Sequence, residues 1–463
     1  MVVRWNAGKQ AEQLNKMITA GGAVQHTDTS AVDNRLRIQH DRDRIVWSAA
    51  FKRLAQKTQV FPQAYGDRHR TRLTHSLEVM QLSTSVARTL GLNPLLCEAI
   101  ALGHDLGHTP FGHAGEDALD NALDKINWNN KPKHLSRFTH YEQGVDIASY
   151  TDSRNPERSA AGMELTDCVL EGIFKHTYDH SGIDTKHKSL AFLLDHTKYK
   201  DKFQKGPGSL EAQVVRVCDK LSYFISDIED GLAVGAIHLD DLMEHELLST
   251  ELKGFANGGF SSGQNDHRIF LQVRNAILTK LIESLLAQST ENLRKTKNRP
   301  ALVIALRDSE SKQTKSIYQD LQKGIIFRHF FVDSATKRAK HIVACLFCQF
   351  LRYPELIPWP FRRKYLGRVD RYCKRLEEIY NITRTDRRSF DMNDWFTNRD
   401  DAEDVSCPGA VNAQFDRRIV DLICVKDYVA GMTDRFAEKQ FNTCVYCWAS
   451  KVAWDKLKRI PLL

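Results

Sequence analysis

One stretch of the chain concentrates side chains that can bind a metal ion and move protons. It reads Gly103-His-Asp-Leu-Gly-His-Thr-Pro-Phe-Gly-His-Ala-Gly-Glu116 and follows an apolar run with helical spacing. The adjacent His104 and Asp105 offer an imidazole nitrogen and a carboxylate oxygen, a mixed donor set that suits Mn²⁺, Fe²⁺, Mg²⁺ or Zn²⁺. Two donors do not complete a coordination sphere, so further ligands must come from elsewhere in the chain.

Two other segments carry a polar donor within a helical pattern. His75 lies in an amphipathic stretch, and Asp219 lies among the apolar residues of another. A carboxylate in such a place is costly to bury unless it is paired or bound to a metal. His75 and Asp219 are therefore candidates to complete a site with His104 and Asp105.

Three more histidines and a glutamate are candidates for proton transfer. His113 and Glu116 stand three residues apart, one helical turn, so the carboxylate can orient the imidazole as a general acid or base. His108 follows His104 by four residues, and His140 lies further along. A single isolated histidine is more often structural, so these positions gain weight only from the motifs around them.

The elements that must position these residues are helices. Apolar residues recur with helical spacing through most of the chain, and the alternation of half-buried strands is almost absent, which predicts an all-α fold. Pro94 fits the first turn of its segment, where proline is tolerated. The expected helices cover about residues 43–58, 72–90, 94–107, 209–231, 269–288, 342–351 and 410–441.

Two breaks in the helical pattern suggest how the chain is organised. Residues 253–265 are rich in types that resist helix formation, and we expect a mobile loop there. Pro354, Pro358 and Pro360 mark the other break. We expect an N-terminal segment over 1–34, a helical core over 35–240 that includes a basic N-terminal motif, and a helical C-terminal region over 241–463 packing on the core.

The composition is that of a globular protein. Of the 463 residues, 42% are hydrophobic and 27% are charged, which excludes collagen-like and wholly disordered chains. No apolar run approaches the roughly 18 residues needed to span a bilayer, and the first residues lack the apolar stretch of a signal peptide. We therefore expect a cytoplasmic protein without membrane association. The formal net charge of +8 is a modest excess that fits anionic partners.

The ten cysteines fit a reducing compartment, and we expect no disulfides. Those in apolar runs are expected to be buried thiols; they are Cys97, Cys218 and Cys424. The pairs Cys345/Cys348 and Cys444/Cys447 have the spacing of a four-thiolate zinc site. Because residues 344–351 have the pattern of a buried helix face rather than a turn-rich zinc knuckle, we favour a core role for the first pair.

Several segments together resemble a known family. The order His75, His104-Asp105, Asp219 resembles the HD superfamily of metal-dependent phosphohydrolases. The chain further resembles the bacterial deoxyguanosinetriphosphate triphosphohydrolases, the dGTPase-like dNTPases, over residues 43–61, 71–79, 103–116, 209–219 and 427–437. The resemblance implies an HD-domain helical core. It also implies hydrolysis of a dNTP, with dGTP among the substrates, to deoxynucleoside and inorganic triphosphate, an activity that controls dNTP pools.

The resemblance implies a metal held by His75, His104, Asp105 and Asp219. Two neutral imidazoles and two carboxylates leave positions open for water and a phosphate oxygen, so the ion lowers the pKa of the water and neutralises charge on the phosphoryl group. We expect Mn²⁺ or Mg²⁺, with Fe²⁺, Ni²⁺ and Zn²⁺ as alternatives.

The same resemblance implies roles for residues around the metal. The catalytic histidine and acidic residue of the family fall at His113 and Glu116, and His108 and His140 match family histidines near the phosphates. The implied substrate-binding residues are Gln59 and Tyr223 at the deoxyribose, Arg72 and, by a looser match, Lys175 at the phosphates, and Asp227.

The chain departs from the common pattern just after Asp219. Family members often have an acidic residue at position 220 and a histidine at 226, where this chain has Lys220 and Ser226. Lys220 adds positive charge, and Ser226 removes an imidazole that would support the ligands. Metal preference and pH optimum therefore do not follow from the resemblance.

Two other functions stay open. One is another HD phosphohydrolase, acting on nucleoside monophosphates, cyclic dinucleotides or the stringent-response nucleotide. The other is a nucleic-acid-binding protein with a vestigial HD site, because residues 361–375 mix basic and aromatic side chains like a single-strand groove. The complete ligand set favours an active enzyme. The resemblance implies a homo-oligomer, and single-stranded DNA or a nucleotide is the effector we consider; base preference, native metal and oligomer size stay open.

Overall fold

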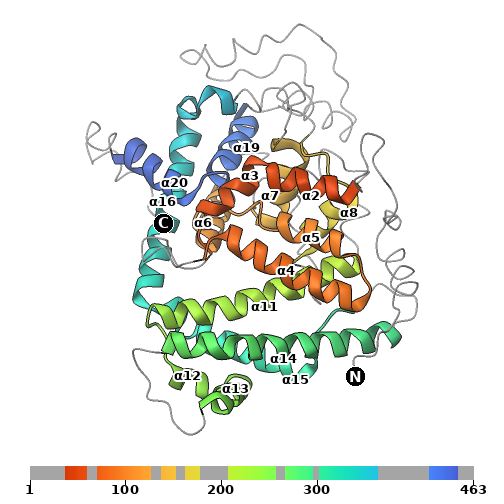
Figure 1. Cartoon of the computed structure of the whole chain (residues 1–463). Coiled ribbons are helices and arrows are strands. Elements are labelled where there is room, and N and C mark those ends of the chain that lie inside the picture. Colours follow the sequence, from red (N-terminus) through yellow and green to blue (C-terminus); the bar gives the residue numbers. More distant parts are fainter. Residues whose placement is uncertain are drawn as a thin grey trace, which may run out of the picture.

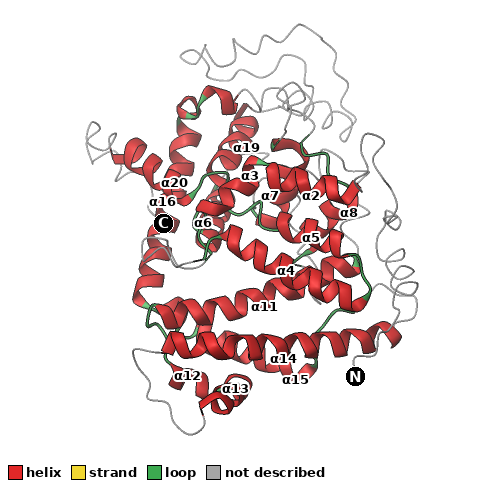
Figure 2. Cartoon of the chain, in the orientation of Figure 1, coloured by secondary structure: helices red, strands yellow, loops and turns green. Residues whose placement is uncertain are grey.

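The fold is helical wherever it can be described. A computed structural model describes residues 37–59, 70–126, 137–152, 162–177, 207–256, 266–295, 302–362 and 417–446. Within these ranges the regular elements are helices, and the strand-like pairing is limited to one isolated antiparallel bridge between Thr58 and Thr71 (Figure 2). The prediction of an all-α fold is confirmed.

Some predictions concern residues outside these ranges. They are the N-terminal segment 1–34, residues 257–265 of the expected loop, and residues 363–375 of the basic cluster. Among the described helices, none combines the length and the apolar character needed to cross a membrane.

The basic N-terminal motif forms two short helices where a single helix over 43–58 was predicted. Helix α2 covers Arg37–Trp47, α3 covers Ala49–Arg53, and a 3₁₀ turn covers Leu54–Gln56. The chain breaks at Ser48, whose hydroxyl accepts a hydrogen bond from the backbone N–H of Phe51 at 3.1 Å. Serine is a strong N-cap, which explains why a new helix begins there.

Helices α4 and α5 begin and end at capping residues. Helix α4 covers Arg72–Leu90, as predicted; a capping box at Thr71 begins it and Gly91, with φ of 69°, ends it. Helix α5 covers Pro94–Gly103 and begins after Asn93, whose side chain accepts from two backbone amides. It ends before the predicted residue 107 because the residues that follow form a turn.

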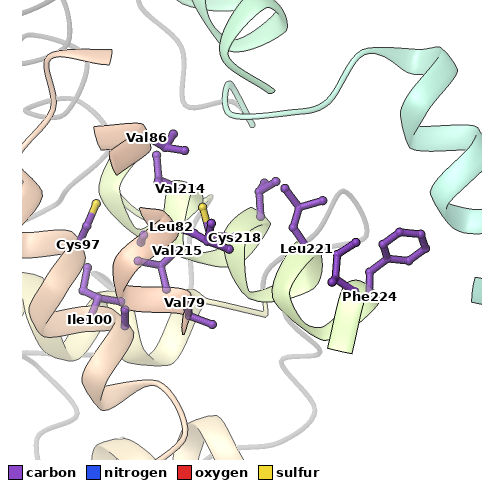
Figure 3. Close-up of a cluster of buried hydrophobic side chains, with 14 of the residues drawn as sticks. Val79, Leu82, Val86, Cys97, Ile100, Val214, Val215, Cys218, Leu221 and Phe224 are labelled. Atoms are coloured by element: carbon purple, nitrogen blue, oxygen red, sulfur yellow. The ribbon is translucent and has the colours of Figure 1, made fainter. Parts of the chain in front are cut away.

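Helices α4, α5 and α11 build the first hydrophobic core. Helix α11 covers Leu210–Ala233 and begins at the cap Ser209, close to the predicted bounds. Its apolar face meets α4 and α5 (Figure 3). The labelled side chains are all buried: Val79, Leu82 and Val86 from α4, Cys97 and Ile100 from α5, and Val214, Val215, Cys218, Leu221 and Phe224 from α11. This core fixes the helices that carry His75, His104 and Asp219.

Further helices surround this core. Helix α8, Asp167–Lys175, packs on α5, α7 and α11, and the long α14, Asp266–Lys295, lies along α11 (Figure 1). The other elements of this part are α7 at His140–Asp146, a π-helical turn at Ile147–Thr151, α12 at Leu239–Met243, α13 at Glu246–Ala256, α15 at Asp308–Ile317, a π-helical turn at Tyr318–Lys323 and a 3₁₀ turn at Ile326–Arg328.

A second hydrophobic core contains the C-terminal helices. Helix α6 covers Gly112–Lys125 and packs against α16, which covers Phe330–Arg352. Helix α19, Arg417–Ala430, packs against both, and α20, Asp434–Gln440, packs against α16 (Figure 1). The predicted helix over 410–441 is thus two helices. A 3₁₀ turn at Pro354–Leu356 and a π-helical turn at Phe441–Tyr446 follow α16 and α20.

The two cores do not divide at residue 240. Leu242 and Phe270 belong to the first core, whereas Leu119 of α6 belongs to the second. The proposed domain boundaries stay a prediction.

The cysteines that are described carry free thiols, and Cys97, Cys218 and Cys424 are buried as predicted. Residues 344–351 lie in α16, but the thiols of Cys345 and Cys348 are half-buried and exposed, because the helix turns Leu346 and Phe347 into the second core instead. Cys447 and the side chain of Cys444 lie outside the described residues.

Candidate metal centre and active site

Three of the four predicted metal ligands form one compact group. Donor atoms of His75, His104 and Asp105 lie within 4.8 Å of one another, and all three residues are buried. His75 comes from the first turn of α4, and the other two follow the last residue of α5. The packing of α4 on α5 therefore brings the two segments together.

The fourth predicted ligand, Asp219 of α11, faces the same point. Its Oδ1 lies 2.9 Å from Nε2 of His75 and 3.6 Å from Nε2 of His104. The Nδ1–H of His104 donates to the carbonyl of Ala101 at 2.6 Å, which directs Nε2 into the site. That Nε2 is buried without a hydrogen-bond partner, although it lies 3.4 Å from Oδ1 of Asp105.

The charges of the group formed by His75, His104, Asp105 and Asp219 suit a bound cation. Burial alone would raise the pKa of Asp219, but the neighbouring imidazoles of His104 and His75 hold it well below its usual range. Burial lowers the pKa of His104, but the carboxylates of Asp105 and Asp219 outweigh burial and raise it to about 9. Two carboxylates and an unpartnered imidazole nitrogen thus share one buried point, which is the donor set of a divalent metal ion.

A second group surrounds Glu116. Donor atoms of His108, His113, Glu116 and His140 lie within 4.8 Å of one another. The Glu116 carboxylate lies 3.2 Å from Nδ1 of His113, and it accepts from the backbone N–H of His140 at 2.8 Å and lies 3.0 Å from its Nδ1. The ring of His108 stacks on that of His140, with centroids 3.9 Å apart. Burial would raise the pKa of Glu116, but the surrounding histidines hold it well below its usual range.

The turn before His113 has an unusual backbone. Phe111 and Gly112 both adopt left-handed conformations, with φ of 61° and 59°. A Cβ at Gly112 would lie 2.7 Å from the guanidinium of Arg72, so any other residue would push Arg72 aside as well as strain the backbone. Arg72 is buried and pairs with Asp105 at 3.1 Å, which joins the turn to the metal group.

Several of the predicted catalytic and substrate-binding residues have buried polar atoms without a hydrogen-bond partner. They are Oε1 of Gln59, Nε of Arg72, Nδ1 of His108 and both carboxylate oxygens of Asp227. Tyr223 lies one turn before Asp227 on α11, and burial raises the pKa of both side chains. Native proteins rarely leave such atoms unsatisfied, so these side chains have donors and acceptors to offer a polar ligand. Atoms of the same kind occur elsewhere in the described residues, for example in Gln322 and Gln349.

Comparisons with known proteins identify the family of this chain. Residues 72–223 match the HD domain family, a range that begins at Arg72 and ends at Tyr223. A deoxyguanosinetriphosphate triphosphohydrolase-like protein of Leptospira interrogans is 31% identical over 422 residues, 88% of this chain and 90% of the relative. Proteins of the same description from Geobacter metallireducens and Wolinella succinogenes are 33% and 44% identical, over 78% and 47% of this chain and 88% and 54% of the relatives. This chain belongs to the dGTPase-like HD-domain family.

Three further residues of this dGTPase-like chain were singled out in its sequence. Lys175 is fully buried on α8, and its ammonium pairs with Glu171 at 2.7 Å. Its assignment to phosphate stays a prediction. Ser226, which stands where other family members often have histidine, is buried and donates to the carbonyl of Tyr223 at 3.1 Å. Lys220 is exposed.

One histidine of the dGTPase-like site was missed by sequence reasoning. His176 is buried at the end of α8, with its ring centroid 5.2 Å from that of His104 and its Nε2 3.4 Å from Nε2 of His140. Burial lowers its pKa to about 3. It directly follows Lys175 in the sequence. The loose match of this segment to the family was used to predict a role for the lysine but not for the histidine beside it.

Proposed function

We propose that this chain hydrolyses dNTPs, with dGTP among its substrates, to deoxynucleoside and inorganic triphosphate. The observation that carries the proposal is the metal-type donor group of His75, His104 and Asp105 in a chain of the dGTPase-like family. Unpartnered buried polar atoms on the other predicted site residues support it. A dNTP offers phosphate oxygens and a sugar hydroxyl in one molecule, which is the chemistry such atoms need.

In this proposal the first group binds a divalent cation, Mn²⁺ or Mg²⁺ before Fe²⁺, Ni²⁺ or Zn²⁺. His75, His104, Asp105 and Asp219 are the ligands. When bound, such an ion supplies Lewis acidity toward the phosphate under attack. The guanidinium of Arg72 and the ammonium of Lys175 are proposed to bind phosphate oxygens, a role that suits fixed cations.

The second group is proposed to handle the proton. Water adds to the α-phosphorus, the bond from phosphorus to the 5′ oxygen breaks, and the 5′ oxygen leaves with a proton. Glu116 engages Nδ1 of His113, so the other ring nitrogen is free to exchange a proton with the reacting groups. His108 and His140 lie beside this pair and are proposed to contact the phosphates.

Product analysis tests the reaction class. Purified protein is incubated with each dNTP and Mn²⁺ or Mg²⁺, and nucleoside, diphosphate and triphosphate are resolved. We expect equal amounts of deoxynucleoside and inorganic triphosphate. Release of orthophosphate or pyrophosphate, or turnover only of cyclic dinucleotides or monophosphates, would assign the chain to another HD phosphohydrolase activity.

We predict that the substitution Tyr223→Ala narrows the ratio of dGTP to GTP hydrolysis. A packed tyrosine ring leaves no room for a 2′-hydroxyl, which GTP has and dGTP lacks. Tyr223→Phe retains the ring and is the matched control, expected to keep the parental ratio. Equal hydrolysis of dGTP and GTP by the parent protein would contradict this assignment.

We further propose a cytoplasmic homo-oligomer. Sedimentation of the full chain tests the assembly, for which we expect a mass above the 53.0 kDa of one chain. Regulation by single-stranded DNA or by a nucleotide stays a prediction, because most of the basic cluster lies outside the described residues.

A further inference from the structure

Residues 427–437 match a family motif, yet no residue of this segment has a part in the proposed reaction. Asp434 is the first residue of α20, and its carboxylate reaches two distant segments. Oδ2 accepts from the backbone N–H of Thr58 at 2.9 Å and from the hydroxyl of that threonine, and Oδ1 accepts from the backbone N–H of Phe111 at 2.8 Å. The cap of α20 is supplied separately by Thr433, whose hydroxyl accepts from Phe436. The carboxylate is therefore not required as a helix cap.

Both segments lead directly into proposed site residues. Thr58 precedes Gln59, whose side-chain oxygen is buried without a partner. Phe111 and Gly112, which both have positive φ, directly precede His113. A non-glycine residue with positive φ is strained and persists only where the surroundings hold it. The hydrogen bond from Phe111 to Asp434 is such a restraint, and it acts two residues before the imidazole.

The packing explains why such a restraint is needed. Helix α6, which carries His113 and Glu116, buries its apolar face in the second core with α16 and α19. The helices that carry the proposed metal ligands belong to the first core. Apolar packing within α4, α5 and α11 therefore does not set the position of His113 relative to the metal group.

Buried polar contacts cross between the two cores at this point. The ammonium of Lys57, only 2% exposed, donates to the carbonyls of His108 and, at 3.0 Å, of Ala430 at the end of α19. One turn earlier, Lys426 donates to the side-chain oxygen of Gln143 on α7 at 2.7 Å. Asp434 completes this row of contacts between the C-terminal helices and the active-site segments.

We propose that Asp434 is a positioning residue. Its carboxylate fixes the position of residues 58–59 relative to that of residues 111–113, so that Gln59 can contact the sugar while His113 faces the scissile phosphate. The expected change in kcat rests on the proposed function, whereas the expected change in hydrogen exchange does not. Asp434 itself touches neither the metal group nor, in this proposal, the substrate.

The test is Asp434→Asn in the full chain. Asparagine keeps the shape and one acceptor oxygen, but its NH₂ group meets N–H and O–H donors, so the hydrogen bonds of at least one segment are lost. We expect kcat for dGTP to fall about 10- to 100-fold, since small misplacements of reacting groups have effects of that size. Metal content stays at the parental level. Glu438→Gln, at a half-buried position of the same helix where the carboxylate pairs with Arg338 of α16, is the matched control and keeps parental kinetics.

Hydrogen exchange gives a readout that needs no substrate. We expect the amides of Thr58 or Phe111 to exchange at least about 10-fold faster in Asp434→Asn while amides of α4 and α11 keep their rates. If Asp434→Asn is recovered unfolded, Thr58→Val replaces it. That change removes only the hydroxyl donor to Asp434, so faster exchange is then expected at the amide of residue 58 and not at that of Phe111. Unchanged exchange at both amides overturns the proposal, as does a loss of activity that only follows the folded fraction. Should the parent prove inactive on every dNTP, the proposed function fails, and exchange alone still decides the placement of the two segments.

Discussion

Replacing His104 or Asp105 by alanine should remove bound metal and activity together, with turnover reduced at least on the order of 10²-fold. The expectation follows from the convergence of four donors from three helical segments on one buried point. His104 has no other use for its Nε2, which is buried without a partner. Elemental analysis of the purified variants measures the metal, and assays with added Mn²⁺ or Mg²⁺ measure turnover.

Controls separate loss of metal from loss of structure. A ligand that binds only the folded state raises the melting temperature, so added metal should raise the Tm of the parent and leave that of His104→Ala unchanged. Asp105 also pairs with the buried Arg72, so Asp105→Asn, which keeps the side-chain volume, accompanies the alanine variant. His341→Ala on α16 changes a histidine outside the site and should keep metal and activity. If both ligand variants bind as much metal as the parent, His104 and Asp105 are not the metal ligands.

Local sequence signals predicted the helices well where a capping residue stands at each end. Helix α4 has the predicted bounds because Thr71 and Gly91 are strong start and stop signals. The break at Ser48 was missed because apolar spacing continues across it, and only the backbone geometry shows that the serine begins a new helix. Capping residues thus locate helix ends better than periodicity does.

The site was predicted less completely than the helices. His75, His104, Asp105 and Asp219 share a point because separate helices pack in one core, and a motif with the family's order carries that information. The contacts of Asp434 with Thr58 and Phe111 join segments more than three hundred residues apart, and no local pattern encodes such a pairing. His176 was overlooked for a different reason, since a buried histidine outside a strong motif is usually structural.

Replacing His113 by alanine should leave metal bound while turnover falls by roughly 10²- to 10⁴-fold, the usual range for proton transfer. The side chain of His113 is 60% exposed, so its removal leaves no cavity and should leave the melting temperature unchanged. The loss would then be one of chemistry and not of fold. Steady-state kinetics, elemental analysis and thermal unfolding on the same preparation measure the three quantities.

Glu116 provides the second arm of this test. Its carboxylate engages both His113 and His140, so Glu116→Gln should lower turnover at least as much as His113→Ala. Because the two residues are proposed to act as a unit, the double variant should be little slower than either single variant. Near-normal turnover of His113→Ala, or loss of its metal as in the ligand variants, would contradict the assignment. Additive losses in the double variant would mean that His113 and Glu116 act independently, and Glu116 would then contribute through its contacts with His140 rather than by orienting His113.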